Sequence, residues 1–284
     1  MTITTSRTLL PGDGITLTAD LWGPEPHNGK GSVVLLHGGG QTRHSWQRTG
    51  IRLAEHGWRA CAVDARGHGD SEWAADGDYT TEAYARDLVS MVDSIGEAPV
   101  LVGASMGGMA ALIAQADHPG LSRALVLVDV VPKAEPAGLT KITGFLERGL
   151  AGFDTLEDAL AAVVAYNPHR RRPPRLDGLR KNLRERDGRW YWHWDPQLLS
   201  DRKKTLDTAT AREIRARAAA RTITVPTLLI RGAQSDIVSA QGARELLELI
   251  PGSRHVDVSG AGHMVSGDDN DVLSEGLLDF LSEI

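Results

Sequence analysis

The sequence predicts an α/β protein with a mostly parallel, doubly wound sheet and one inserted segment. Three observations lead to this fold class. Short apolar runs alternate along the chain with longer segments of helical periodicity. The apolar runs are continuous, as is typical of strands buried on both faces of a parallel sheet. The rhythm stops near residue 133 and resumes near residue 223, which indicates an insertion.

The first part of the chain supplies most of the predicted elements. Two strands, near 2–10 and 15–23, are separated by the turn signal Pro11-Gly-Asp-Gly14. Four more strands are predicted at 32–36, 59–63, 99–103 and 124–128, with helices at 44–56, 81–95 and 106–117. After the insertion we expect a strand at 226–231, a helix at 240–250, a strand at 253–258 and a last helix from about 270.

Residues 133–222 are predicted to form a helical cap on a core made of residues 1–132 and 223–284. The cap is locally basic through Arg170-Arg-Arg172 and the arginines of 175–189, which we expect on a solvated helix face; recognition of an anionic substrate group is the alternative. Three aromatic residues alternate at strand-like spacing, namely Trp190, Trp192 and Trp194. We expect them to pack the cap onto the core, or alternatively to line an apolar acyl pocket.

Composition excludes several classes of partner. The 284 residues carry a net charge of -6, which argues against nucleic acid and anionic membranes. The single cysteine, Cys61, rules out an intrachain disulfide and lies in an apolar run, so we expect it to be buried. The chain shows neither a signal-peptide pattern nor an apolar run of about 18 residues, so a cytoplasmic location is expected.

The most informative segment is Gly103-Ala-Ser105-Met-Gly107-Gly108, which fits the G-x-S-x-G pattern between a predicted strand and a predicted helix. A serine at such a turn has an exposed hydroxyl at the positive end of a helix dipole. The flanking glycines let the strand and helix pack closely. Ser105 is therefore the predicted nucleophile.

A serine nucleophile needs a base and a carboxylate that orients the base. His263 follows the last predicted strand, at the sheet edge where active sites of open α/β sheets form, and is the predicted base. Asp236 follows the strand at 226–231 and is the predicted carboxylate. Asp129, which ends the strand at 124–128, is the alternative.

Acyl transfer also needs donors for an oxyanion. We expect the backbone N–H of Met106 and that of Gly39, in His37-Gly-Gly-Gly40, with Gly40 as second choice and as a neighbour of the substrate. His37 is expected to order its own loop, and His68 and Asp70 to be turn residues. The histidine spacings match no metal-ligand pattern, so no metal is expected.

These residues resemble the α/β-hydrolase family, in its single-domain form with a helical cap. The matching marks, in order, are His37-Gly-Gly-Gly40, Asp64-Ala-Arg-Gly-His-Gly-Asp-Ser71, Gly103-x-Ser105-x-Gly107-Gly108, Asp236 after its strand, and Gly262-His263. The resemblance implies the fold, a serine nucleophile, no cofactor and hydrolytic chemistry.

The predicted function is cleavage of a small to medium carboxylic ester, lactone or thioester through an acyl-enzyme on Ser105, with a small molecule as substrate. Carbon–carbon bond hydrolases are one alternative, although the sequence departs from their pattern at Gln41-Thr42 and at Met264. A haloperoxidase, cyclase or lyase on the same scaffold is another. A ligand receptor whose triad no longer turns over is the third.

Overall fold

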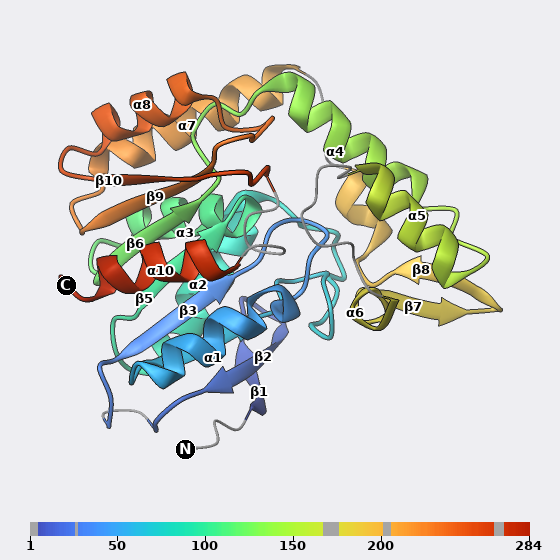
Figure 1. Cartoon of the computed structure of the whole chain (residues 1–284), viewed down its shortest axis with the longest axis horizontal. Coiled ribbons are helices and arrows are strands. Elements are labelled where there is room, and N and C mark those ends of the chain that lie inside the picture. The colour runs from blue at the N-terminus through green and yellow to red at the C-terminus, as the bar shows by residue number, and fades with distance from the viewer. Residues whose placement is uncertain (1–4, 26–27, 167–175, 201–205, 264–269) are drawn as a thin grey trace.

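A sheet of eight strands forms the centre of the molecule, in the order β1-β2-β4-β3-β5-β6-β9-β10 (Figure 1). β1 and β2 are antiparallel to their neighbours, and all other pairs are parallel. The computed structural model describes residues 5–25, 28–166, 176–200, 206–263 and 270–284. The strands are β1 (Ser6–Pro11), β2 (Thr16–Trp22), β3 (Ser32–Leu36), β4 (Arg59–Val63), β5 (Val100–Ala104), β6 (Ala124–Val128), β9 (Thr227–Gly232) and β10 (Arg254–Val258).

The central strands form because their residues are apolar on both sides. Every residue of β5 and β6 is buried, which requires helices on both faces of the sheet. α1 (Gln47–Glu55) and α10 (Asn270–Leu281) cover one face. α2 (Thr81–Ile95), α3 (Met106–Asp117), α7 (Leu206–Thr222) and α8 (Ala240–Leu249) cover the other. The predicted doubly wound α/β architecture is confirmed.

Local signals set the ends of these helices. Thr80 caps α2 by accepting a hydrogen bond from the Ala83 N–H at 3.2 Å, and Gly96 ends the helix in the left-handed conformation at φ 77°. Ser239 caps α8 in the same way through the Gly242 N–H. None of the helices in the described ranges is both long and apolar enough to cross a bilayer.

The inserted segment lies over the carboxyl ends of the strands (Figure 1). It contains α4 (Pro136–Arg148), α5 (Leu156–Tyr166), α6 (Leu176–Arg180), β7 (Leu183–Arg186), β8 (Arg189–Trp192) and the 3-10 helix η2 (Pro196–Leu199). We use the name cap for residues 133–200. Its apolar side chains meet core residues, among them Tyr84 and Ala110, in one cluster. This cluster places the cap directly above the helices that flank β5.

The cap differs from the sequence prediction in two respects. The helix expected to carry the arginines of 175–189 is short, and residues 183–192 form an antiparallel hairpin. Asp187 and Gly188 both take positive φ, at 51° and 75°, and close its tight turn. The helix α7 lies beside α8 and not in the cap (Figure 1). Arg217 of α7 pairs with Glu245 of α8, and Ala219 and Ala220 are buried against the sheet. The described cap is thus shorter than the predicted 133–222. Arg170–Arg172 lie outside the described residues.

Candidate active site

Ser105 lies at the sharp turn between β5 and α3. Its backbone is held at φ 46° and ψ -111°, a sparsely populated conformation that costs about 1–3 kcal/mol. The positions two residues before and after it leave no room for a Cβ atom, so they must be glycine. A Cβ on Gly103 would lie 2.5 Å from the Cα of Gly108, and one on Gly107 would lie 2.7 Å from the His37 carbonyl oxygen. The backbones of β5 and α3 therefore lie in contact with each other. Ser105, at the turn between them, is partly exposed.

Asp129 lies beside Ser105 at the end of the neighbouring strand. β5 and β6 pair with Ala104 opposite Val128, and the Ser105 N–H donates to the Val128 carbonyl at 3.0 Å. Asp129 also has a positive φ, 49°, and its side chain is only 1% exposed. Two adjacent strands thus end in strained residues at the same level of the sheet.

The Asp129 carboxylate receives three hydrogen bonds. Its Oδ1 accepts from the Gly232 N–H at 2.9 Å, and its Oδ2 accepts from the Ser235 hydroxyl at 2.6 Å and from His263 Nδ1 at 2.7 Å. A carboxylate can only accept, so Nδ1 of His263 carries the proton. In the neutral ring, Nε2 is then left with its lone pair, as a general base requires.

The prediction that Asp236 pairs with His263 is wrong. Its carboxylate binds Lys141 Nζ of α4 at 2.7 Å, with the side chain 39% exposed. The cause is the turn after β9, where the Ser235 hydroxyl accepts the N–H groups of Ile237 and Val238 and donates to Asp129. This turn directs Ser235 toward the site and Asp236 toward the cap.

His263 and Ser105 lie at the same sheet edge, since β10 pairs with β9 and β9 with β6. Within the described part of the chain, Ser105 and His263 share no direct hydrogen bond, while the contact between His263 and Asp129 is formed. In hydrolases without substrate, the contact between nucleophile and base is often long and tightens when substrate binds. The structure therefore brings together the base and its carboxylate next to the nucleophile's strand.

The glycine-rich loop after β3 lies against Ser105. A Cβ on Gly38 would be 3.5 Å from the Ser105 Cβ. The N–H of Gly40 donates to His68 Nε2 at 3.2 Å, so it is already engaged and is not a free donor. The N–H of Gly39 has no partner among the described residues, and Met106 opens α3, where the first N–H groups have no partner within the helix. This geometry favours Gly39 over Gly40 as the second donor.

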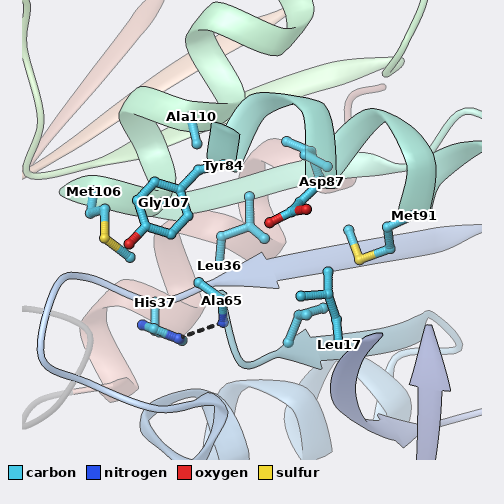
Figure 2. Close-up of a pocket in the computed structure, with 12 residues that line it drawn as sticks. Leu17, Leu36, His37, Ala65, Tyr84, Asp87, Met91, Met106, Gly107 and Ala110 are labelled. Carbon is cyan, nitrogen blue, oxygen red and sulfur yellow. Dashed lines mark hydrogen bonds between the residues drawn. The ribbon is translucent and has the colours of Figure 1, made fainter. Parts of the chain in front are cut away.

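An apolar cavity lies between the sheet and the helices α2 and α3 (Figure 2). In this view His37, Met106 and Tyr84 lie toward one end and Met91 and Leu17 toward the other. Most of its lining is aliphatic, with Leu36, Val63, Leu88 and Ala110 among the wall residues. Met106, the residue that follows the predicted nucleophile, is thus part of the cavity wall.

The charged residues of the 64–71 segment support the same loops. Arg43, which follows the glycine-rich loop, is fully buried and pairs with Asp64, with Asp20 at 3.1 Å and with Asp70 at 2.9 Å. Burial alone would lower the pKa of Arg43, but the carboxylates around it, Asp64 above all, raise it. Because a buried cation without these partners would be costly, the network fixes the two loops relative to each other.

The cap tryptophans lie at the junction between cap and core. Trp192 and Trp194 are buried in the shared apolar cluster, at 7% and 3% exposure, and Trp190 is partly buried in β8. The backbone of Trp190 exchanges two hydrogen bonds with Phe153. None of the three lines the cavity described above. Their predicted packing role fits this position, and their role in substrate binding stays a prediction.

Sequence comparisons agree with this architecture. The alpha/beta hydrolase fold family matches residues 31–269. The esterase Rv0045c of Mycobacterium tuberculosis is 33% identical over 259 residues, which are 87% of this chain and 82% of that protein. The 3-hydroxybutyrate-oligomer hydrolase of Cupriavidus necator is 30% identical over 85% of both chains.

A structural comparison gives the same result for the fold. The crystal structure of E-2-(acetamidomethylene)succinate hydrolase superposes with a TM-score of 0.84 and 24% identity, over 98% of this chain and all of the other. At that identity the likeness concerns the fold alone. Together with the family match and the esterase relative, it leads to one assignment: the chain belongs to the α/β-hydrolase family and is a hydrolase.

Proposed function

We propose that the protein is a serine hydrolase that cleaves a small to medium carboxylic ester, lactone or thioester through an acyl-enzyme on Ser105. The observation that carries the proposal is the contact of 2.7 Å between His263 Nδ1 and Asp129 Oδ2, one strand away from a strained serine at the same level of the sheet. An imidazole held in this tautomer is suited to remove the proton of a nearby hydroxyl.

In the proposed mechanism, His263 Nε2 takes the proton of Ser105 as Oγ attacks the carbonyl carbon of the substrate. The N–H groups of Met106 and Gly39 donate to the oxyanion that forms. His263 then gives the proton to the leaving oxygen or sulfur, and the acyl-enzyme remains. A water molecule, deprotonated by the same imidazole, attacks the acyl carbon and releases the acid. Asp129 keeps the proton on Nδ1 and stabilises the imidazolium through both half-reactions.

Two observations support the proposed substrate class. Met106, next to Ser105, lies in the wall of a mainly aliphatic cavity, and apolar surroundings favour a substrate with a hydrocarbon part. The similarity to an esterase and to a hydrolase of 3-hydroxybutyrate oligomers supports an ester over a carbon–carbon bond.

Ser105→Ala tests the proposal. We expect the variant to lose hydrolysis of p-nitrophenyl acetate and butyrate by at least about 10³-fold in kcat. It should melt at the temperature of the wild type, because the hydroxyl has no hydrogen bond to lose among the residues that the structure describes. A fluorophosphonate probe should add to the wild type and not to the variant, as intact mass would show. A variant that keeps most of its esterase activity contradicts the assignment. A chromogenic ring-fission substrate turned over faster than both esters would favour the carbon–carbon alternative.

A further inference from the structure

Three histidines that are far apart in the sequence meet beneath the glycine-rich loop. His37 follows β3, His68 follows β4, and His193 follows β8 in the cap. The ring centroids are 5.0 Å apart for His37 and His68 and 5.8 Å apart for His68 and His193. All three side chains are buried. None of the three takes part in the proposed acyl transfer, so their meeting at one place points to a different role.

Each ring accepts a hydrogen bond from a backbone N–H, which fixes its tautomer. His37 Nε2 accepts from the Ala65 N–H at 3.0 Å, so its Nδ1 carries the proton and donates to the Gly38 carbonyl at 2.8 Å (Figure 2). His193 Nδ1 accepts from the Gly69 N–H at 2.6 Å, so its Nε2 carries the proton. A ring that accepts on one nitrogen is neutral. Burial agrees with this state, because it lowers the pKa of His37 and that of His193.

The peptide groups of Gly40 are held from both sides by two of these rings. The N–H of Gly40 donates to Nε2 of His68, from the core, at 3.2 Å. Its carbonyl accepts from Nε2 of His193, from the cap, at 3.3 Å. Gly40 is in the left-handed conformation, at φ 77°, which glycine adopts without strain but which two hydrogen bonds make a single defined state. The Gly40 carbonyl shares a peptide group with the Gln41 N–H, which donates to the Gly38 carbonyl at 3.1 Å. The Gly38 carbonyl in turn shares a peptide group with the Gly39 N–H, so the orientation of that N–H depends on the peptide that His193 holds.

We propose that His193 is a positioning residue, through which the seated cap sets the oxyanion donor of Gly39. This inference rests on the proposed acyl-transfer function. His193 acts through its hydrogen bond to the Gly40 carbonyl and does not touch the substrate. Asp195 and Asn182 also join the cap to core loops, through hydrogen bonds to Gly67 and Thr42. Those bonds hold the cap in place, whereas the bond from His193 reaches the glycine-rich loop itself.

Two substitutions separate positioning from simple structural support. In His193→Asn the side-chain oxygen can stand at the place of Nδ1 and accept from Gly69, but no donor reaches Gly40. In His193→Gln the amide nitrogen can stand at the place of Nε2 and donate to the Gly40 carbonyl, while the bond from Gly69 is lost. Each variant loses one buried hydrogen bond, so we expect both to be less stable than the wild type and to a similar extent.

The experiment measures kcat and KM for p-nitrophenyl butyrate, with Thr42→Val as a control that breaks a bond of 2.9 Å between cap and core without touching Gly40. We expect kcat of His193→Asn to fall at least about 10-fold with KM little changed, since loss of a whole oxyanion donor costs about 10²–10³ in rate. His193→Gln and Thr42→Val should stay within about threefold of the wild type in kcat.

Equal losses of kcat in His193→Asn and His193→Gln would overturn the proposal, and so would a loss in Thr42→Val as large as that in His193→Asn. If His193→Asn does not fold, His193→Gln still decides, because a loss of about 10-fold or more in kcat there contradicts a role through the Gly40 carbonyl. Failure of the proposed function is recognised separately, by a Ser105→Ala variant that stays active.

Discussion

The sheet edge and the cap hold their functional side chains by different means. At the edge, Ser105 and Asp129 are placed by the register of two fully buried strands, and both have strained backbones that this register imposes. In the cap, Trp192 and Trp194 pack in an apolar cluster, and His193 between them makes one hydrogen bond to the Gly40 carbonyl and one to the Gly69 N–H.

In the proposed mechanism the reacting side chains come from the sheet edge, and the cap contributes only contacts to the loops around them. Strained positions persist where the surrounding structure determines them fully, as the pairing of two buried strands does for Ser105 and Asp129. The proposed reaction geometry is therefore tied to the sheet. The cap is joined by fewer and more replaceable contacts, which suits a segment that adjusts the site without supplying its reacting groups.

The largest expected effect separates two aspartates of similar sequence setting. Asp129→Asn should lower kcat by about 10³–10⁴-fold, because an amide in place of the carboxylate favours the wrong tautomer of His263. Asp236→Asn should leave kcat within about threefold, since Asp236 is exposed in part and its one ion pair within the described ranges is with Lys141. Steady-state kinetics with one p-nitrophenyl ester checks both variants. A large loss in Asp236→Asn with little loss in Asp129→Asn would reverse the assignment of the carboxylate.

The contrast between the two aspartates also shows what the sequence could predict. The strands, the flanking helices and the nucleophile follow from apolar runs and from a glycine pattern whose steric meaning is fixed. Both aspartates come after a strand on the same edge, so strand position alone does not choose between them. The choice depends on the turn made by Ser235, a contact between residues 106 positions apart in the sequence.

The cap was harder to predict for a related reason. Its hairpin is marked only by Asp187-Gly188, a turn signal that the arginine-rich, partly helical pattern around it obscures. No local signal indicates His193, because its partners Gly40 and Gly69 belong to other loops. Sequence periodicity predicts helices and strands that bury apolar side chains. It does not predict a side chain whose role depends on one hydrogen bond to a distant part of the chain.

The next expected effect compares two glycines, one in each region. Gly103→Ala should lower the free energy of unfolding by about 3 kcal/mol, the upper part of the range for overpacking, because the added Cβ would lie 2.5 Å from backbone atoms of Gly108. Gly144→Ala, in α4 of the cap, should raise it by up to about 1 kcal/mol, because nothing lies within 4 Å of its Cβ and alanine favours the helix. Urea unfolding of both variants measures the difference. Equal changes in the free energy of unfolding for the two variants would contradict the expectation that the sheet edge has no room for an added methyl group and the cap helix has.

The smallest expected effect concerns acid pH. Burial, with a contribution from His37, lowers the pKa of His193 to about 3, well below the ordinary value of about 6.5. Between these two values the unfolded chain binds a proton that the folded ring does not, so stability falls as the pH falls, by up to about 1.4 kcal/mol per pH unit. Arg184 and Asp70, the charged groups near the ring, affect its pKa in opposite directions.

His193→Gln removes this titrating group and serves as the test. Denaturant unfolding at pH 7 and at pH 5 should show a loss of stability in the wild type that exceeds the loss in the variant by about 2 kcal/mol. An identical loss in both proteins would mean that the ring is protonated in the folded state at pH 5, and the tautomer assigned to His193 would then be wrong.

A crystal structure of the protein after reaction with an alkyl fluorophosphonate tests the central claim most directly. We expect phosphorus bonded to Ser105 Oγ, one phosphoryl oxygen at about 2.7–3.1 Å from the N–H groups of both Met106 and Gly39, and Nε2 of His263 turned toward the adduct while Nδ1 stays on Asp129. An adduct on another residue, or a phosphoryl oxygen that points away from both N–H groups, would contradict the account.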